Sequence, residues 1–158
     1  MHIRRIDVMD DRRIAQIIRQ VLEEFGAARE GTVYTDETTD HLSKVFLKEG
    51  SAYWVAEENG IVSGGAGIYP TDGLDEDTCE LVKMYLLPEF RGKGLGQSLL
   101  DRCIAFAIES GYRKCYIETM PELKGAIQLY LKNGFLPLNA PLGNSGHHGC
   151  SMWFIKDL

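Results

Sequence analysis

Four stretches of the chain carry apolar residues at helical spacing, at every third or fourth position. The pattern predicts four helices, at residues 11–25, 35–48, 95–110 and 121–133. Asp10 or Asp11 can cap the first of them, and Gly26, Gly111 and Gly134 follow three of them. Glycine is common after a helix because it adopts the left-handed conformation without strain. We therefore expect each of these three helices to end at its glycine.

Short runs rich in β-branched and aromatic residues lie between the helices. They predict strands at residues 3–6, 52–57, 61–69, 79–87 and 114–119, a short strand opened by Phe135, and a last strand at 150–155. Asn59-Gly60 separates the second strand from the third, and this dipeptide is typical of a tight hairpin. The strand, helix and strand over residues 79–119 form a βαβ unit, which is expected to be right-handed. The chain is therefore expected to form an α/β domain with a mixed sheet.

Chain length indicates the number of domains, and net charge indicates which partners to expect. A chain of 158 residues is expected to form one domain, residues 1–158. It carries 17 basic and 23 acidic side chains, a formal net charge of −6, and no basic block. Phosphate-backbone binding depends on a basic surface, so nucleic acid is not the expected partner.

The spacing of the cysteines and the lack of long apolar runs indicate the cellular compartment of the protein. Four cysteines stand far apart, without the spacing of a metal site: Cys79, Cys103, Cys115 and Cys150. The first residues contain no apolar signal segment, and no run of 18 apolar residues occurs. These features predict a reduced, cytoplasmic protein with no metal and no membrane partner.

The stretch FRGKGLGQ, residues 90–97, places three glycines and two cations before the third helix. A dinucleotide-binding fingerprint needs G-x-G-x-x-G, and here the third glycine comes one residue early. A nucleotide-hydrolase loop needs G-x-x-x-x-G-K-[ST], a string absent from the chain. The stretch fits Arg-x-x-Gly-x-Gly instead. Exposed backbone N–H groups at a helix start form an anion site, and the cations add charge to it. Such a loop suits a pyrophosphate.

The segment ELVKMYLLPEFRGKGLGQSLLDRCIAFAIESGYRKCYIET, followed by AIQLYLKNGF, resembles the GCN5-related N-acetyltransferases (GNAT). The likeness covers residues 80–135. It implies a mixed, mostly antiparallel sheet flanked by about four helices, with a splayed central strand pair. It also implies acetyl-CoA as the acyl donor, and dimers are common in the family. Leu123 departs from the family pattern, since many members carry an asparagine there.

The resemblance assigns the coenzyme site. Residues 91–96, with Gln97 on the new helix, would hold the coenzyme A pyrophosphate, and the backbone at the end of the fourth strand would pair with the pantetheine arm. The implied coenzyme-binding residues are Met84, Tyr85, Leu86, Arg91, Gly92, Lys93, Gly94, Leu95, Gly96 and Gln97. A backbone N–H near residues 84–86 would stabilise the oxyanion.

Two residues are the catalytic candidates. Tyr130 matches the family tyrosine that often protonates the departing thiolate, although its helical spacing also suits a core position. Glu80 begins the fourth strand, where some members place a general base, although an acid at a strand start can equally be a solvated residue.

Other polar residues are candidates for contact with the acceptor. Glu118 is a second possible base, and His147 a possible substrate contact. His147 and His148 are adjacent, so they do not suggest a metal site. The pocket for the acceptor is expected to use the first two helices and the loops at 70–79 and 139–149. The acidic 70–79 loop is compatible with a cationic amine.

The predicted function is acetyl-CoA-dependent acetyl transfer to a primary amine, on a small molecule or a protein. The alternative is a non-catalytic acyl-CoA-binding sensor that keeps the glycine loop without turnover. A third possibility is a nicotinamide oxidoreductase, which the glycine spacing disfavours.

Overall fold

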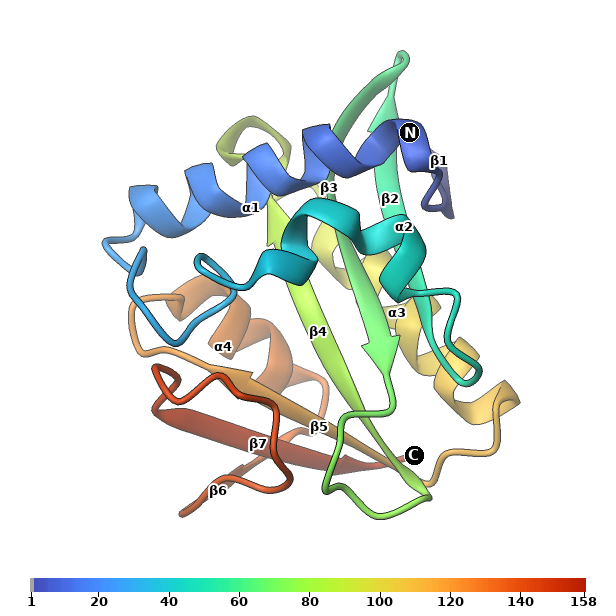
Figure 1. Cartoon of the computed structure of the whole chain (residues 1–158), viewed down its shortest axis with the longest axis vertical. Coiled ribbons are helices and arrows are strands. Elements are labelled where there is room, and N and C mark those ends of the chain that lie inside the picture. Colours follow the sequence, from blue (N-terminus) through green and yellow to red (C-terminus); the bar gives the residue numbers. More distant parts are fainter. Residues whose placement is uncertain (1) are drawn as a thin grey trace.

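The computed structural model describes residues 2–158. Its strands are β1 (His2–Arg5), β2 (Ala52–Glu58), β3 (Ile61–Tyr69), β4 (Thr78–Leu86), β5 (Lys114–Thr119), β6 (Leu136–Leu138) and β7 (Met152–Asp157), and its helices are α1 (Asp11–Glu24), α2 (Leu42–Val45), α3 (Leu95–Glu109) and α4 (Lys124–Lys132). The strands form one sheet in the order β1-β2-β3-β4-β5-β7-β6. β4 and β5 are parallel, whereas the other neighbouring pairs are antiparallel (Figure 1). The expected mixed, mostly antiparallel sheet with four helices is confirmed.

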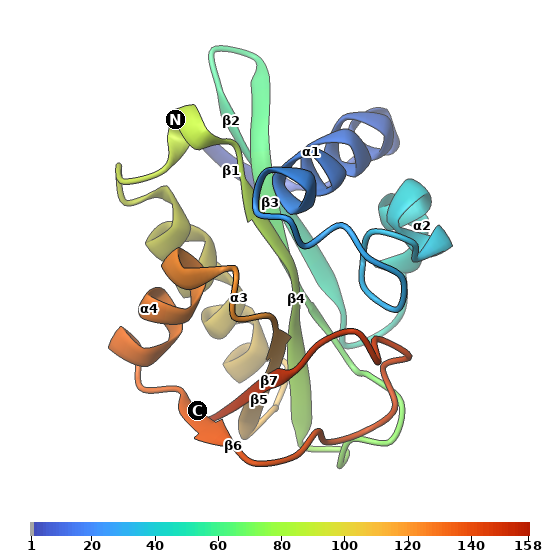
Figure 2. The same ribbon diagram turned by 90° about the vertical axis from the view of Figure 1, so that its left-hand side faces the viewer.

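The helices cover both faces of the sheet. Figure 2 shows α1 and α2 on one face and α3 and α4 on the other. α1 buries an apolar stripe that includes Ile14, Ile17 and Leu22, all without exposed surface. α3 buries Leu99 and Cys103 on the opposite face. Each buried leucine or isoleucine stabilises the fold by roughly 1.5–3 kcal/mol, so these stripes determine which helix face meets the sheet.

The predicted hairpin is present between β2 and β3. Asn59 and Gly60 both have positive φ, 53° and 78°, as a tight two-residue turn requires. The turn sets the register that pairs Glu58 with Ile61.

The predicted helix over residues 35–48 is wrong in its length. The structure has a 3-10 turn at Glu37–His41 and then only the four residues of α2. Side chains compete for the backbone there: Asp36 accepts from the Thr38 N–H, and the Thr39 hydroxyl donates to the Val33 carbonyl. Such local bonds favour turns over a continuous helix.

A predicted helix and a predicted strand have different boundaries in the structure. The helix expected from residue 121 begins at Lys124, because Leu123 closes a turn by donating its N–H to the Met120 carbonyl. The last strand was expected at 150–155 and lies at Met152–Asp157. Cys150 instead donates its N–H to the His147 carbonyl, so it belongs to a turn.

The central strand pair splays. β4 pairs with β5 only over three positions, from Thr78 opposite Lys114 to Glu80 opposite Tyr116. Beyond this point no strand among residues 2–158 pairs with the edge of β4 that faced β5, although β4 continues to Leu86. The splayed pair that the resemblance implied is therefore present, and it opens the middle of the sheet.

Candidate active site

The glycine loop presents bare backbone at the start of α3. Gly92 and Gly94 have φ of 71° and 81°, and a Cβ on either would meet no atom within 4 Å. Gly94 immediately precedes α3, and the first backbone bond of the helix runs from Ser98 N–H to the Gly94 carbonyl. The preceding N–H groups therefore have no acceptor inside the helix, and they carry the positive end of its dipole. This geometry suits an anion.

Arg91 anchors the loop to α1. Its Nη atoms donate to the Glu24 carboxylate at 2.7 and 2.8 Å, and its Nε donates to the Leu86 carbonyl at 2.8 Å. The guanidinium also lies 4.9 Å from the centre of the Phe25 ring. The Arg91 hydrogen bonds lower the pKa of Glu24. Glu24 thus neutralises much of the charge that the sequence placed at the loop rim, and nothing in the sequence signalled this pairing.

A cleft of about 410 Å³ begins at this loop. It is lined by Val21, Phe25, Met84, Tyr85, Leu86, Arg91, Gly92, Gly94, Gly96, Gln97, Leu123, Gly125, Ala126, Leu129 and Lys132. Eight of the ten residues expected to bind coenzyme A therefore border one cleft. Leu95 does not, because it is buried in the core, and the exposed Lys93 is not among the lining residues. The wall from α4 was missed, since its apolar residues look like ordinary core positions in the sequence.

Gln97 borders the cleft but uses its side-chain amide to join two helices. Its Nε2 donates to Asn133 Oδ1 at 2.8 Å, and Asn133 Nδ2 donates back to Gln97 Oε1 at 2.9 Å. The pair fixes the start of α3 against the end of α4, which are the two sides of the cleft.

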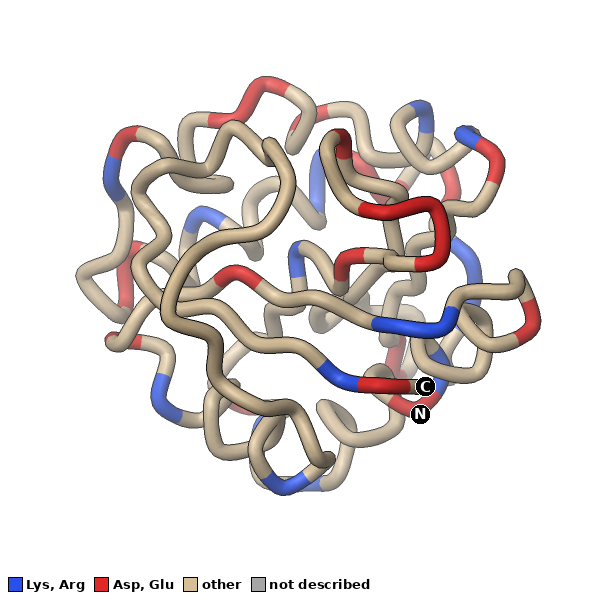
Figure 3. The backbone as a smooth tube through the Cα atoms, turned by 90° about the horizontal axis from the view of Figure 1, so that it is seen from below, with Lys and Arg blue, Asp and Glu red and all other residues tan. Residues whose placement is uncertain are grey.

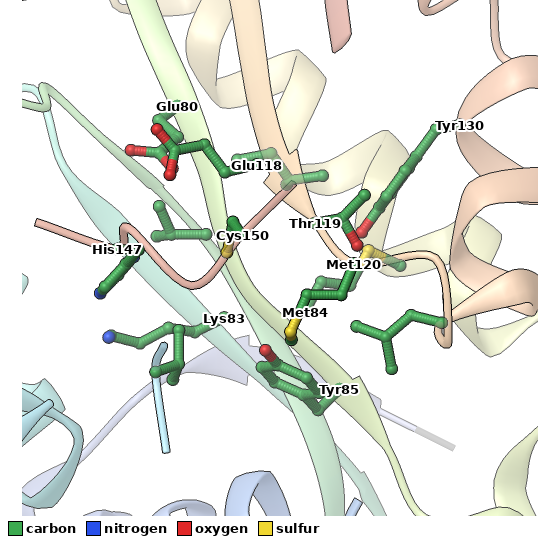
Figure 4. Close-up of a pocket in the computed structure, with 14 residues that line it drawn as sticks. Glu80, Lys83, Met84, Tyr85, Glu118, Thr119, Met120, Tyr130, His147 and Cys150 are labelled. Atoms are coloured by element: carbon green, nitrogen blue, oxygen red, sulfur yellow. The ribbon is translucent and has the colours of Figure 1, made fainter. Parts of the chain in front are cut away.

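A smaller cavity of about 40 Å³ lies where β4 and β5 separate. Figure 4 shows the carboxyl groups of Glu80 and Glu118 at one end of it and Tyr130 at the other. Lys83, Met84, Tyr85, His147 and Cys150 also line this cavity. The splay thus brings together residues from β4, β5, α4 and the loop before β7.

Tyr130 is both a core residue and a cavity residue. It is 5% exposed and its ring lies against Phe135 and Phe154, at centroid distances of 5.9 and 6.3 Å. In residues 2–158 its hydroxyl has no hydrogen-bond partner, and the side chain borders the cavity. Burial raises the pKa of Tyr130, so the phenol is protonated at neutral pH.

Glu80 is 3% exposed and borders the same cavity. Burial raises the pKa of its carboxyl to about 7, and the nearby Glu118 adds to this rise. The Thr71 hydroxyl donates to the Glu80 carboxyl, which opposes the rise. Glu118 accepts from the Tyr116 hydroxyl at 3.0 Å and from the Ser145 hydroxyl at 2.8 Å. A carboxyl with a pKa near 7 can take up a proton at neutral pH.

A buried charged group that the sequence did not signal adjoins these acids. Lys83 is 8% exposed and donates to Asp36 at 3.2 Å. His147 Nε2 lies 2.9 Å from the same Asp36 oxygen. Burial alone would raise the pKa of Asp36, but the His147 contact, the Lys83 charge and the Thr38 bonds lower it. Burial lowers the pKa of Lys83 while Asp36 opposes that shift. His147 therefore reaches the cavity, whereas His148 is exposed.

The sequence and structure resemble known proteins. The model of the acetyltransferase (GNAT) family matches residues 15–135. The uncharacterized N-acetyltransferase YjgM of Escherichia coli (strain K12) is 43% identical over 156 residues, which is 98% of this chain and 93% of that protein. Human N-acetyltransferase 8 is 33% identical over 118 residues, covering 70% of this chain and 52% of that protein.

Solved structures share the fold. A GNAT acetyltransferase from Staphylococcus aureus superposes with a TM-score of 0.83, covering 99% of this chain and 98% of that one at 19% identity. The putative acetyltransferase yncA from Salmonella typhimurium, solved with acetyl-CoA, gives a TM-score of 0.75 at 25% identity, covering 99% and 93% of the two chains. The chain therefore belongs to the GNAT family, and it is an acyltransferase.

Proposed function

We propose that this protein transfers the acetyl group of acetyl-CoA directly to a primary amine. One observation carries the proposal: Met84, Tyr85 and Leu123 line both the 410 Å³ cleft and the 40 Å³ cavity. A ligand that binds the glycine loop and follows β4 would therefore bring its far end beside Tyr130 and Glu80.

The cleft fits coenzyme A in shape and chemistry. Its glycine end offers unpaired N–H groups to a pyrophosphate, and Lys132 adds a cation to its lining. Its other wall is apolar, with Leu86, Leu123 and Leu129, which suits a pantetheine arm. The related yncA protein was solved with acetyl-CoA, which supports the same ligand here.

The cavity residues can carry out the transfer. The amine nitrogen forms a bond to the acetyl carbon as the carbon–sulfur bond breaks. Glu80 takes the proton that the amine loses, and Tyr130 gives a proton to the departing sulfur. A backbone N–H of the 84–86 segment can donate to the acetyl oxygen, because this part of β4 no longer pairs with β5.

The acceptor is expected to approach from the side of His147. A shallow hollow of about 370 Å³ lies there, and it shares His147 with the cavity. Glu30 and Asp36 line the hollow, and no lysine or arginine of the described part of the chain does. Figure 3 shows the acidic run Asp75–Asp77 on the loop between β3 and β4. The uncharged loop that precedes β7 lies beside it, and the Asn144 N–H of that loop donates to the Asp72 carbonyl of the β3–β4 loop. This distribution favours a cationic acceptor.

Acetylation of a matched set of amines tests the function. We expect butylamine and 1,4-diaminobutane to be acetylated and 4-aminobutyrate to react poorly, because its carboxylate would face the acids of the site. Thiol release and the mass of the product measure the transfer. Coenzyme A binding without transfer to any amine, including lysine peptides and amino sugars, would contradict the proposal and favour the sensor alternative.

Glu80 should set the pH dependence. We expect kcat/KM to rise as the pH passes through about 7, where Glu80 loses its proton. Glu80→Gln should remove this rise and lower kcat by about 100-fold. Thr71→Val removes a hydroxyl that lowers the pKa of Glu80, so it should move the rise to higher pH. An unchanged profile in Glu80→Gln would contradict the role as base.

Stability provides a second measurement on the same variant. The folded protein binds the Glu80 proton more tightly than an unfolded chain, whose carboxyl titrates near 4.5. The stability that this group contributes is therefore present below pH 4.5 and lost as the pH rises through about 7. Glu80→Gln should reduce this loss, measured as the free energy of unfolding at pH 5 and pH 8.

A further inference from the structure

β4 contains a bulge beside the candidate active site. Gly65 of β3 is opposite Tyr85, and Gly67 is opposite Val82, so two residues of β4, Lys83 and Met84, face the single residue between the glycines. Lys83 has φ of +50°, the left-handed conformation that strains a residue with a long side chain. A non-glycine residue keeps this conformation when its surroundings hold it there.

A hydrogen bond from Tyr53 of β2 holds Lys83 in this conformation. The Tyr53 hydroxyl donates to the carbonyl oxygen of Lys83 at 2.8 Å, in a bond that is fully buried. The Tyr53 side chain is 1% exposed, so water does not compete for this bond. The Lys83 ammonium donates to the Asp36 carboxylate at 3.2 Å. The bulge is thus fixed both through its backbone and through its side chain.

Two glycines of β3 make room for the Tyr53 ring. A Cβ on Gly65 would lie 2.6 Å from Tyr53 Cε1, and a Cβ on Gly67 would lie 2.6 Å from Tyr53 Cδ2. Real Cβ atoms do not come this close to a ring carbon, so a side chain at either position would require the tyrosine ring to move. It would also lie close to backbone, 2.5 Å from the Trp54 carbonyl oxygen at Gly65 and 2.9 Å from the Ala52 carbonyl oxygen at Gly67. Glycines in a central strand weaken it, and close approach of another group is a common reason for them. The two glycines therefore allow the Tyr53 side chain to reach the bulge.

We propose that Tyr53 is a positioning residue for acetyl transfer, because it holds the β4 bulge that directs a backbone N–H of the 84–86 segment toward the acetyl oxygen. This inference rests on the proposed function. Tyr53 does not line the cavity or the cleft, so it acts through Lys83 and Met84. Met84 and Tyr85 are the next residues along β4 and border both spaces.

Tyr53→Phe tests the proposal with one atom removed. We expect kcat to fall by about tenfold or more, because small misplacements of a reacting centre have effects of this size. The Kd of acetyl-CoA should change less than about threefold, since the glycine loop is untouched. Tyr112→Phe is a matched control: its hydroxyl also donates to a backbone carbonyl at 2.8 Å, that of Gly50, and it lines neither space. Equal kcat in Tyr53→Phe and wild type, or equal losses in both variants, would overturn the proposal.

A measurement without turnover separates this proposal from the function itself. In wild type, the amide resonances of residues 84–86 should differ between the acetyl-CoA and coenzyme A complexes, and Tyr53→Phe should reduce that difference. If the wild-type protein acetylates no amine but shows this behaviour, the proposed function fails, and only the part of the inference in which Tyr53 positions the backbone that binds the acetyl group stands. An undiminished difference in Tyr53→Phe would overturn the role of Tyr53 even in an active enzyme.

Discussion

Gly94→Glu is expected to weaken coenzyme A binding by at least about 100-fold, which corresponds to about 2.8 kcal/mol. Gly94 lines the cleft and immediately precedes α3, and a side chain there would extend into open space. A carboxylate at this point occupies the N–H groups that would otherwise bind phosphate, and it repels the phosphate charge. Calorimetric titration with coenzyme A measures the effect.

Two variants separate charge from backbone strain. Gly94 has φ of 81°, so a side chain there costs about 1–2 kcal/mol of stability. Gly94→Ala carries this strain without the charge, and it should bind coenzyme A within a few-fold of wild type. Gly111→Glu adds the same charge beyond the other end of α3, at a glycine that also has positive φ and open space. Unchanged affinity in folded Gly94→Glu, with folding checked by circular dichroism, would refute the assignment of the loop.

Tyr130→Phe is expected to lower the rate of acetyl transfer by about 100-fold, with little change in the Kd of acetyl-CoA. The phenol borders the cavity and has no other hydrogen-bond partner in the described chain, so its proton is available for the departing sulfur. Rapid mixing under single-turnover conditions measures this step even when product release limits kcat.

The melting temperature of Tyr130→Phe shows whether a slower transfer reflects lost chemistry or lost folding. Tyr130→Phe should leave the melting temperature nearly unchanged, because the hydroxyl makes no hydrogen bond within residues 2–158 and the ring keeps its contacts with Phe135 and Phe154. A slow but stable variant supports the role as general acid. A wild-type transfer rate would leave Tyr130 with its packing role against Phe135 and Phe154.

The glycine loop and the long helices could be predicted because their signals are local. In α1 and α3 the spacing of apolar residues, the following glycine and the observed helix agree. The second helix was overestimated, because the hydrogen bonds from Asp36 and Thr39 to nearby backbone override its apolar spacing. The ends of α4 and β7 depended on turns that apolar spacing does not reveal.

The residues that line the cleft could likewise be predicted only in part from the sequence. The loop residues were recognisable from their glycines and cations, but the α4 wall was not, because Ala126 and Leu129 border the cleft only after α4 packs beside α3. Glu24 could not be paired with Arg91 in advance, since 67 positions separate them.

The amino-acid sequence by itself determined the family, the mixed sheet and the position of the glycine loop before α3, because these follow from periodicity and from a contiguous motif. Only the tertiary structure decided what surrounds the splay of β4 and β5. Asp36 meets Lys83 across 47 positions and His147 across 111, and Tyr53 meets Lys83 across 30. Contacts between residues so far apart depend on how the sheet and loops close. Burial in that closed site raises the pKa of Glu80, and the contacts with Tyr53 and Asp36 hold Lys83 in its left-handed conformation.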